Sequence, residues 1–162
     1  HKRINDKKLK IDENSILIIR GCGPVGYPGS AEVVNMQPPD RLLKKGITHL
    51  PTLGDGRQSG TSESPSILHV SPESAVGGDL GIVKTGDKMK IDLNKRRVDL
   101  LISQLEFKKR RKNKKLFKAN NQTPWQEIFR DTVGQLEDGA CINSRGNYLD
   151  ISNKKGLPRN SH

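Results

Sequence analysis

The sequence predicts a loop-rich α/β domain that contains more strand than helix. Its apolar residues occur in short runs separated by turns, and the 162 residues include 16 Gly and 9 Pro. Hydrophobic residues make up 31% and aromatic residues 4% of the chain, so a single domain with a modest core is expected. Short strands and short helices without a regular alternation favour a β-rich α/β fold over a helical bundle.

Strands are expected where short apolar runs border turns. The first is predicted at residues 15–19 and the second at 47–53, and each leads directly into a glycine-rich loop. Three further strands are expected at 81–84, 88–92 and 97–102, of which the last two should form a hairpin. One more short strand is predicted at 147–151, within a tail from 134 to 162 that has little other periodicity.

Four helices are predicted from their capping residues. Ser30 can cap a short helix over 30–36, and Asp40 can cap another over 41–45, with Gly46 at its end. A capping box at Ser103 and Glu106 begins a third helix that continues into a basic segment. A second box, Thr123-Pro124-Trp125-Gln126, begins the fourth helix. The apolar residues of this fourth helix that fall on one face are Trp125, Ile128, Phe129 and Val133.

The net charge of +11 is concentrated in residues 108–118, which contain eight Lys or Arg. Such a segment could bind nucleic acid or an anionic surface. It has a lone Phe117 beside it and no aromatic interleaving, so a solvated basic helix face is favoured over a nucleic-acid site. Cys22 and Cys141 are too far apart in sequence to form a metal-binding pair by spacing, which indicates a reduced, intracellular chain. No apolar run approaches the length of a membrane span.

The densest group of candidate functional residues is the loop 54–62, GDGRQSGTS. Its glycines permit positive φ, and its hydroxyls can bond a small anionic ligand. A similar loop at 20–29 follows the preceding apolar strand. Two such loops at two strand ends suggest one shared site.

Three familiar motifs fit these loops poorly. Gly21, Gly23 and Gly26 have dinucleotide-binding spacing, but Pro24 and Pro28 prevent the helix that this motif requires. The 54–62 loop lacks the Lys of a phosphate-binding P-loop. Arg57 and Thr61 occupy the positions where a nucleophile elbow needs Gly on either side of Ser59, so acyl transfer is disfavoured. From spacing alone, Glu32 is best interpreted as a solvent-facing helix residue.

A family resemblance changes the interpretation of Ser59 and Glu32. RGCGPVGYPG at 20–29 followed by AEV, LGDGRQSGTS at 53–62, SPE at 71–73 followed by GG, and IDLNKR at 91–96 resemble, in order, the C-terminal domain of the dihydroxy-acid and sugar-acid dehydratases, the family that includes phosphogluconate dehydratase. QTPWQEIFR at 122–130, NYLDIS at 147–152 and GLPRNSH at 156–162 resemble its sugar-acid branch, such as arabinonate and xylonate dehydratases.

The resemblance implies a swivelling, barrel-like domain that closes over an N-terminal half carrying a 2Fe-2S cluster and Mg²⁺. Ser59 matches the proposed base that removes the C2 proton, Thr61 the residue that helps hold substrate, and Glu32 a magnesium ligand. Arg57 either clamps a substrate carboxylate or holds the loop through backbone hydrogen bonds. Cys22 is not a cluster ligand by the family pattern, and Ser30 stands where the family usually has Met.

On this resemblance, residues 1–162 form one C-terminal domain that lacks its first strands and is inactive alone. The predicted activity is dehydration of a 2,3-dihydroxy acid, preferably a sugar acid such as arabinonate or xylonate, by a full-length cytoplasmic or mitochondrial homo-oligomer. The alternatives are the dihydroxy-acid dehydratase of branched-chain amino-acid biosynthesis and a nucleic-acid-binding module at 108–118. No membrane partner is expected.

Overall fold

The computed structural model describes residues 3–30, 32, 37–58, 63–116 and 120–143. They form a mixed α/β structure with two sheets. The parallel sheet has the order β1-β2-β3, with β1 at Leu17–Ile19, β2 at Thr52–Gly54 and β3 at Ser66–Ile67. The antiparallel sheet contains β4, Met89–Asp92, and β5, Arg97–Leu100. Within these described residues, the strands form two separate sheets and no closed barrel.

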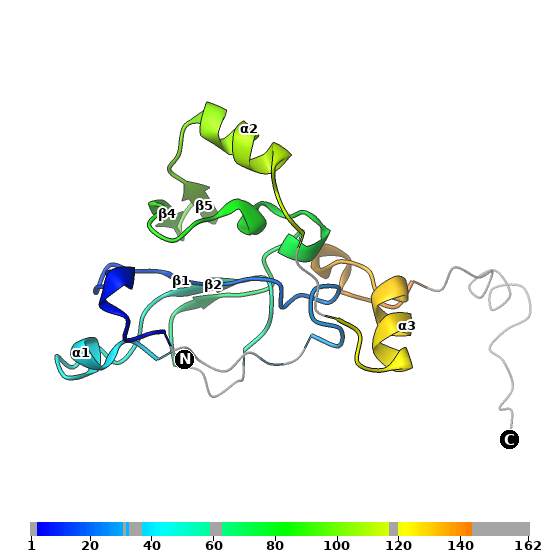
Figure 1. Cartoon of the computed structure of the whole chain (residues 1–162), viewed down its shortest axis with the longest axis horizontal. Coiled ribbons are helices and arrows are strands. Elements are labelled where there is room, and N and C mark those ends of the chain that lie inside the picture. The colour runs from blue at the N-terminus through cyan, green and yellow to red at the C-terminus, as the bar shows by residue number, and fades with distance from the viewer. Residues whose placement is uncertain (1–2, 31, 33–36, 59–62, 117–119, 144–162) are drawn as a thin grey trace, which may run out of the picture.

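Three α-helices lie around the sheets. They are α1 at Asp40–Leu43, α2 at Gln104–Lys112 and α3 at Pro124–Thr132. Figure 1 shows the β4–β5 hairpin and α2 on one side of the parallel strands, with α1 and α3 toward opposite ends of the molecule. Short 3₁₀ helices occur at Lys7–Leu9, Ser74–Val76, Asp79–Ile82 and Leu136–Asp138. None of the helices in the described ranges is both long and apolar enough to cross a membrane.

The parallel register places the two glycine-rich loops beside each other. Leu17 pairs with Thr52, and Ile19 pairs with Gly54, so β1 and β2 end at the same sheet edge. The loop after β1 and the loop after β2 therefore start side by side, as expected for a site built from two strand ends.

The sheet separates two small hydrophobic clusters. Successive strand side chains point to opposite faces. Leu17 therefore packs with Leu42 and Leu50, whereas Ile18 packs against a second cluster beneath the hairpin. The buried members of the second cluster are Leu53, Leu80 and Val83. These small cores agree with the low apolar content of the chain.

Two strand predictions need correction. Within the run predicted at 47–53, strand pairing begins only at Thr52. Pro51 has no N–H to donate to a neighbouring strand. Ile47 N instead donates to Leu42 O at 3.0 Å, at the end of α1. The predicted strand at 81–84 is wrong. Its first residues belong to the 3₁₀ helix Asp79–Ile82, in which Leu80 and Ile82 are both buried.

The hairpin and the N-cap residues of the two predicted capping boxes are confirmed. Ser103 Oγ accepts a hydrogen bond from Glu106 N, and Thr123 Oγ accepts one from Gln126 N, each at 3.2 Å. The helix expected at 30–36 falls mainly outside the described residues. Ser30 itself has φ 46°, not the extended conformation of an N-cap, and Glu32 is not helical. The strand expected at 147–151 lies outside the described residues.

The basic segment is only partly solvated, because Arg110 anchors α2 to the rest of the fold. Its Nη1 and Nη2 donate to the two carboxylate oxygens of Asp87 at 2.6 and 3.0 Å, and its Nε donates to Glu106 at 2.7 Å. The Arg110 side chain is 12% exposed and that of Asp87 is 10% exposed. The hydrogen bond from Arg110 holds the pKa of Asp87 below its usual range.

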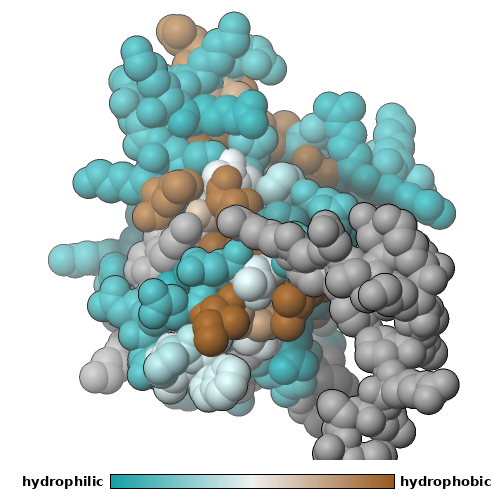
Figure 2. Space-filling view, turned by 90° about the vertical axis from the view of Figure 1, so that its right-hand side faces the viewer, coloured by the Kyte–Doolittle hydropathy of each residue, from teal (hydrophilic) through white to brown (hydrophobic). Residues whose placement is uncertain are grey.

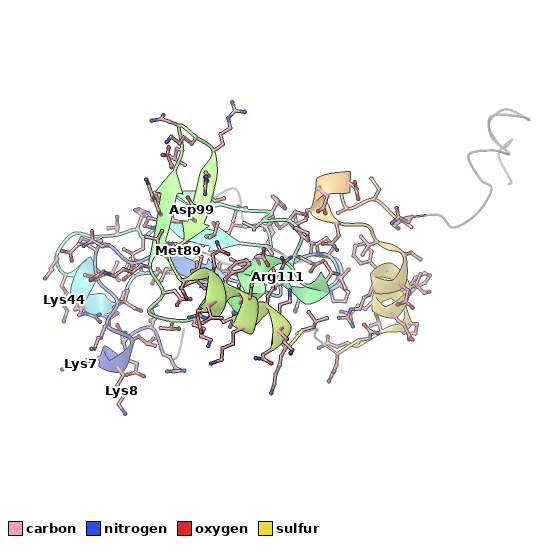
Figure 3. The ribbon with its side chains drawn as sticks, turned by 90° about the horizontal axis from the view of Figure 1, so that it is seen from above. Lys7, Lys8, Lys44, Met89, Asp99 and Arg111 are labelled. Carbon is pink, nitrogen blue, oxygen red and sulfur yellow. The ribbon has the colours of Figure 1, made fainter. Side chains whose placement is uncertain are left out.

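Figure 3 shows other basic residues at the distant end that carries α1, including Lys7 and Lys44.

The Asp87–Arg110 pair should make stability depend on pH. A carboxyl whose pKa is lowered on folding stabilises the fold above its unfolded pKa, about 4, and loses this contribution as pH falls through the folded pKa. Asp87→Asn should therefore lower the melting temperature at pH 7, and the difference from wild type should shrink below pH ~4. Asp131→Asn, at an exposed position, is the matched control. A difference that stays constant from pH 7 to 3 would contradict the assignment.

Candidate functional site

The two glycine-rich loops are joined by the buried carboxylate of Asp55. Asp55 directly follows β2 and has no exposed surface. Its oxygens accept hydrogen bonds from the backbone N–H groups of Gly21 at 3.0 Å, Cys22 at 3.0 Å and Ser74 at 2.9 Å. Ser74 Oγ also donates to Asp55 at 2.5 Å. One carboxylate thus fixes the start of the first loop against the second loop and against the 3₁₀ helix Ser74–Val76.

A second buried carboxylate, Glu73, holds the middle of the first loop. It accepts hydrogen bonds from Val25 N and Gly26 N, both at 2.8 Å, and is fully buried. Gln135 supports it from the segment after α3, because its Nε2 donates to Glu73 Oε1 at 3.0 Å and its Oε1 accepts from Glu73 N at 3.1 Å. The first loop therefore has two separate carboxylate anchors.

Close packing explains why particular glycines are needed here. A Cβ added to Gly23 would lie 2.5 Å from Glu73 Oε2, and one added to Gly56 would lie 2.7 Å from Cys22 Cβ. Real Cβ atoms do not approach other atoms so closely. Gly23 is thus required by the close approach of Glu73 to the first loop, and Gly56 by the approach of the two loops to each other, rather than by positive φ.

Helix α3 adds a further support from the C-terminal part of the chain. Arg130 Nε donates to Val25 O at 2.8 Å. The tail expected to be loosely structured begins just beyond α3, and its first residues make ordered contacts through Gln135 and through a hydrogen bond from Gly134 N to Cys141 O at 2.8 Å. The tail beyond residue 143 lies outside the described residues.

Arg57 and Glu32 meet between the two loops. Arg57 Nε donates to Ser30 O at 2.6 Å, and its Nη1 lies 3.4 Å from Glu32 Oε1. Both side chains are about half exposed, at 47% and 50%. Arg57 thus makes a backbone hydrogen bond of the kind expected if it holds the loop in place. Part of its guanidinium still faces solvent. Ser59 and Thr61 lie outside the described residues.

The described residues supply part of a magnesium site at most. Glu32 offers exposed carboxylate oxygens, which are the ligands that Mg²⁺ prefers, and its present partner is a half-exposed Arg that a cation could displace. No group of three or more His, Cys, Asp or Glu in the described ranges is arranged to hold a metal. Other ligands would have to come from elsewhere.

Cys22 has the environment of a packed thiol. Burial, and then the charge of Asp55, raise its pKa. Its side chain is partly buried, and its Sγ lies 3.9 Å from Arg20 O. The interpretation of Cys22 as a packed or pocket-lining residue, and not a cluster ligand, stays a prediction.

Sequence reasoning missed the residues that hold the site together, Asp55, Glu73, Ser74 and Gln135. The signal for two of them was present, because Asp55 lies inside the GDGR block and Glu73 inside SPE. The anchoring role of a carboxylate that accepts hydrogen bonds from loop N–H groups can be recognised only when the loops are known to be adjacent. Gln135 carries no local signal at all.

Comparisons with known proteins show the family of this chain. The family model described as "Dihydroxy-acid/6-phosphogluconate dehydratase C-terminal" matches residues 1–140. The chain belongs to this family. The match includes both glycine-rich loops, their two anchoring carboxylates and α3.

Relatives of this dehydratase family differ in how much of the chain they match. D-xylonate dehydratase of Caulobacter vibrioides is 56% identical over 162 residues, which is 100% of this chain and 27% of that protein. L-arabinonate dehydratase of Rhizobium leguminosarum bv. trifolii is 50% identical over 108 residues, 67% of this chain and 19% of that protein. Dihydroxy-acid dehydratase of Thermodesulfovibrio yellowstonii is 39% identical over 142 residues, 87% of this chain and 25% of that protein. The chain thus spans a quarter or so of the length of these relatives.

Replacing either anchoring carboxylate should destabilise the fold. Asp55→Asn or Glu73→Gln turns an acceptor into a donor that faces backbone N–H groups, so each should cost roughly 3 kcal/mol in free energy of unfolding. Denaturant unfolding followed by circular dichroism measures this loss. The exposed Glu13→Gln serves as the charge-matched control, with a change within about 0.5 kcal/mol. Equal stability of all three variants would mean that the loops are held by other contacts.

Proposed function

We propose that this chain is the C-terminal part of a dehydratase that removes water from an aldonic sugar acid, such as xylonate or arabinonate, to give the 2-keto-3-deoxy acid. The observation that carries the proposal is the 56% identity to a D-xylonate dehydratase across the whole chain. The identity to a dihydroxy-acid dehydratase is lower, at 39% over 142 residues. Dehydration of a branched-chain dihydroxy acid is therefore the second candidate.

The loop arrangement supports a role in binding an acid and moving a proton. Arg57 and Glu32 place a cation and a carboxylate in contact between two loops that are rigidly anchored to each other. In this proposal Ser59 removes the proton from C2, Thr61 helps hold the substrate, and Arg57 either orients the substrate carboxylate or keeps the loop in place.

The bond changes balance without any external reductant or oxidant. Loss of the C2 proton and of the C3 hydroxyl forms water and an enol, and the enol becomes the 2-keto acid. Magnesium, with Glu32 as one ligand, and a 2Fe-2S cluster held by the N-terminal half would supply positive charge and a Lewis acid when bound. Beside such a cation, Ser59 would more readily form the alkoxide that accepts the C2 proton, because the cation stabilises the alkoxide.

Surface features support a partner within the same polypeptide. Three apolar side chains are largely exposed: Leu105 at 80%, Trp125 at 78% and Leu93 at 75%. Figure 2 shows apolar side chains interrupting the hydrophilic surface on the side of the molecule that carries α3. Among the described strands, β1 is paired on one edge only, with β2. An N-terminal domain covering these surfaces, and strands completing a barrel-like swivelling domain, would account for both features.

Substrate preference of the full-length protein tests the proposal. Production of 2-keto acid from xylonate or arabinonate should exceed that from 2,3-dihydroxy-isovalerate by at least about tenfold in kcat/KM, a difference of ~1.4 kcal/mol in transition-state binding. The reverse preference would establish the branched-chain alternative. Turnover of none of the three acids would overturn the proposed activity. The isolated 162-residue chain should be inactive.

The base assignment makes a separate prediction. Ser59→Ala in the full-length protein should lower kcat by about 10² to 10⁴-fold, because proton removal at C2 loses its acceptor. Iron and magnesium content, measured by elemental analysis, should stay unchanged. Ser62→Ala removes a neighbouring hydroxyl and should keep near-normal turnover. Retained activity in Ser59→Ala would refute the role of Ser59 while leaving the dehydratase proposal intact.

A further inference from the structure

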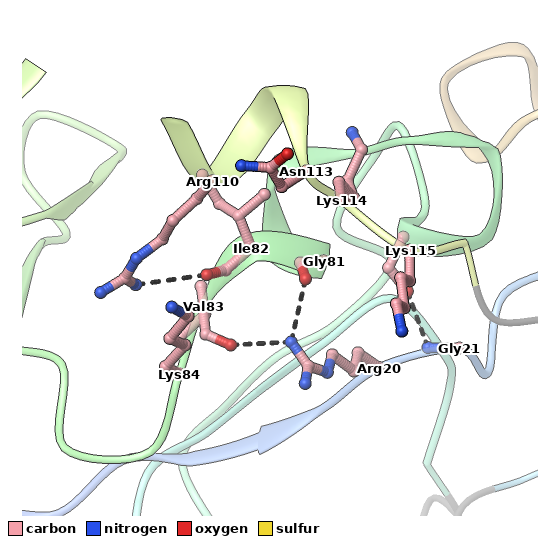
Figure 4. A pocket seen from close by; sticks show the side chains of 11 residues that line it. Arg20, Gly21, Gly81, Ile82, Val83, Lys84, Arg110, Asn113, Lys114 and Lys115 are labelled. Carbon is pink, nitrogen blue, oxygen red and sulfur yellow. Dashed lines mark hydrogen bonds between the residues drawn. The ribbon is translucent and has the colours of Figure 1, made fainter. Parts of the chain in front are cut away.

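A basic cavity lies beside α2, apart from the residues proposed for catalysis. It has a volume of about 430 Å³ and is bounded by the end of β1, the 3₁₀ helix Asp79–Ile82 and the segment that follows α2. Five of its eleven lining residues are cationic and none is acidic: Arg20, Lys84, Arg110, Lys114 and Lys115 carry the charges. Figure 4 shows these side chains around the cavity. We propose that this cavity binds the phosphate group of a small phosphorylated metabolite.

Arg20 is preorganised to bind an oxyanion. Its Nη1 donates to Gly81 O at 3.0 Å and to Val83 O at 2.7 Å, which uses both Nη1 hydrogens (Figure 4). Within the described part of the chain, its Nε and Nη2 make no hydrogen bond. These two nitrogens form the edge of a guanidinium that binds two oxygens of a phosphate or carboxylate side by side. The side chain therefore loses little conformational entropy when it binds an anion.

The charges around the cavity are only partly compensated. Arg110 is neutralised by Asp87 and Glu106 and forms a wall of the cavity. Lys84 reaches Glu106 only at 3.9 Å. Lys114 donates one hydrogen bond to Gly77 O. Lys115 has no ion pair within the residues that the structure describes. Cations gathered around one cavity repel one another, so a bound anion would relieve an unfavourable arrangement.

The lining favours a small phosphorylated molecule over nucleic acid. A phosphate dianion presents several oxygens and two negative charges to the four cations Arg20, Lys84, Lys114 and Lys115, whereas a single carboxylate presents two oxygens and one charge. The volume falls in the range of small-molecule sites, and Ile82 and Val83 provide an apolar wall for the rest of the ligand. None of the lining residues is aromatic, so the cavity offers no surface on which bases could stack.

The cavity goes beyond the proposed dehydratase activity. Neither Arg57 nor Glu32 lines it. It shares Gly21 and Ser74 with the network around Asp55, so a ligand would sit behind the first glycine-rich loop. A phosphate bound there would not need to be the substrate.

Calorimetric titration of pyrophosphate and inorganic phosphate into the full-length protein tests the proposal. At 0.15 M salt, pyrophosphate should bind with a Kd below about 1 mM. Lys84→Ala/Lys115→Ala should weaken binding at least about tenfold, and Arg20→Lys, which keeps the charge but loses the planar edge, by several-fold. The control Lys108→Ala/Lys112→Ala removes the same charge from α2 outside the cavity and should change the Kd less than about twofold.

Three results would overturn the proposal. One is the absence of binding at millimolar pyrophosphate. Another is equal weakening in both double variants, which would show that only overall charge matters. The third is tighter binding of a single-stranded oligonucleotide that the Lys108→Ala/Lys112→Ala control weakens, which would favour a nucleic-acid surface along α2. Thermal melting of each variant confirms that it is folded.

Discussion

The buried carboxylate of Asp55 is the interaction on which the arrangement of the candidate site depends. It accepts hydrogen bonds from N–H groups of the first glycine-rich loop and of the 3₁₀ helix Ser74–Val76. Asp55 directly follows β2, at the sheet edge where β1 also ends. A buried carboxylate without such donors would be strongly destabilising. The loops can therefore take this conformation only together, and the contact between Arg57 and Glu32 follows from that pairing.

The fold around this anchor is small and has few redundant contacts. Two hydrophobic clusters lie on opposite faces of a sheet whose strands are three, three and two residues long. Much of the remaining order comes from polar side chains that bind backbone groups, such as Glu73 in the first loop and Arg20 beneath the 3₁₀ helix Asp79–Ile82. Such a domain relies on fully satisfied hydrogen bonds more than on burial of apolar area.

Local sequence signals predicted the elements that depend on local interactions. The capping boxes at Ser103 and Thr123 start α2 and α3 where expected, and the hairpin forms around residues 93–96. The predictions failed where tertiary contacts decide the conformation. The apolar run at 81–84 begins as a 3₁₀ turn, because burial of Leu80 in the cluster beneath the hairpin, together with burial of Ile82, outweighs strand propensity.

The candidate site was predicted only in part, because its remaining contacts also depend on tertiary structure. The two loops were recognised from their glycines, and family motifs drew attention to Arg57 and Glu32, which the structure brings together. The role of Asp55 and Glu73 depends on partners 19 to 62 residues away, and no periodicity reports such pairs. Ser59 and Thr61 rest on the resemblance alone.

The contacts that α3 and Gln135 make have a consequence for comparing branches of this family. Arg130 and Gln135 fasten the first loop from a segment more than one hundred residues later in the chain, through Val25 and Glu73. A hybrid enzyme that took its loops from one branch and its C-terminal helix from another would separate parts that fit one another. Grafting experiments between sugar-acid and branched-chain enzymes should therefore transfer both segments as one unit.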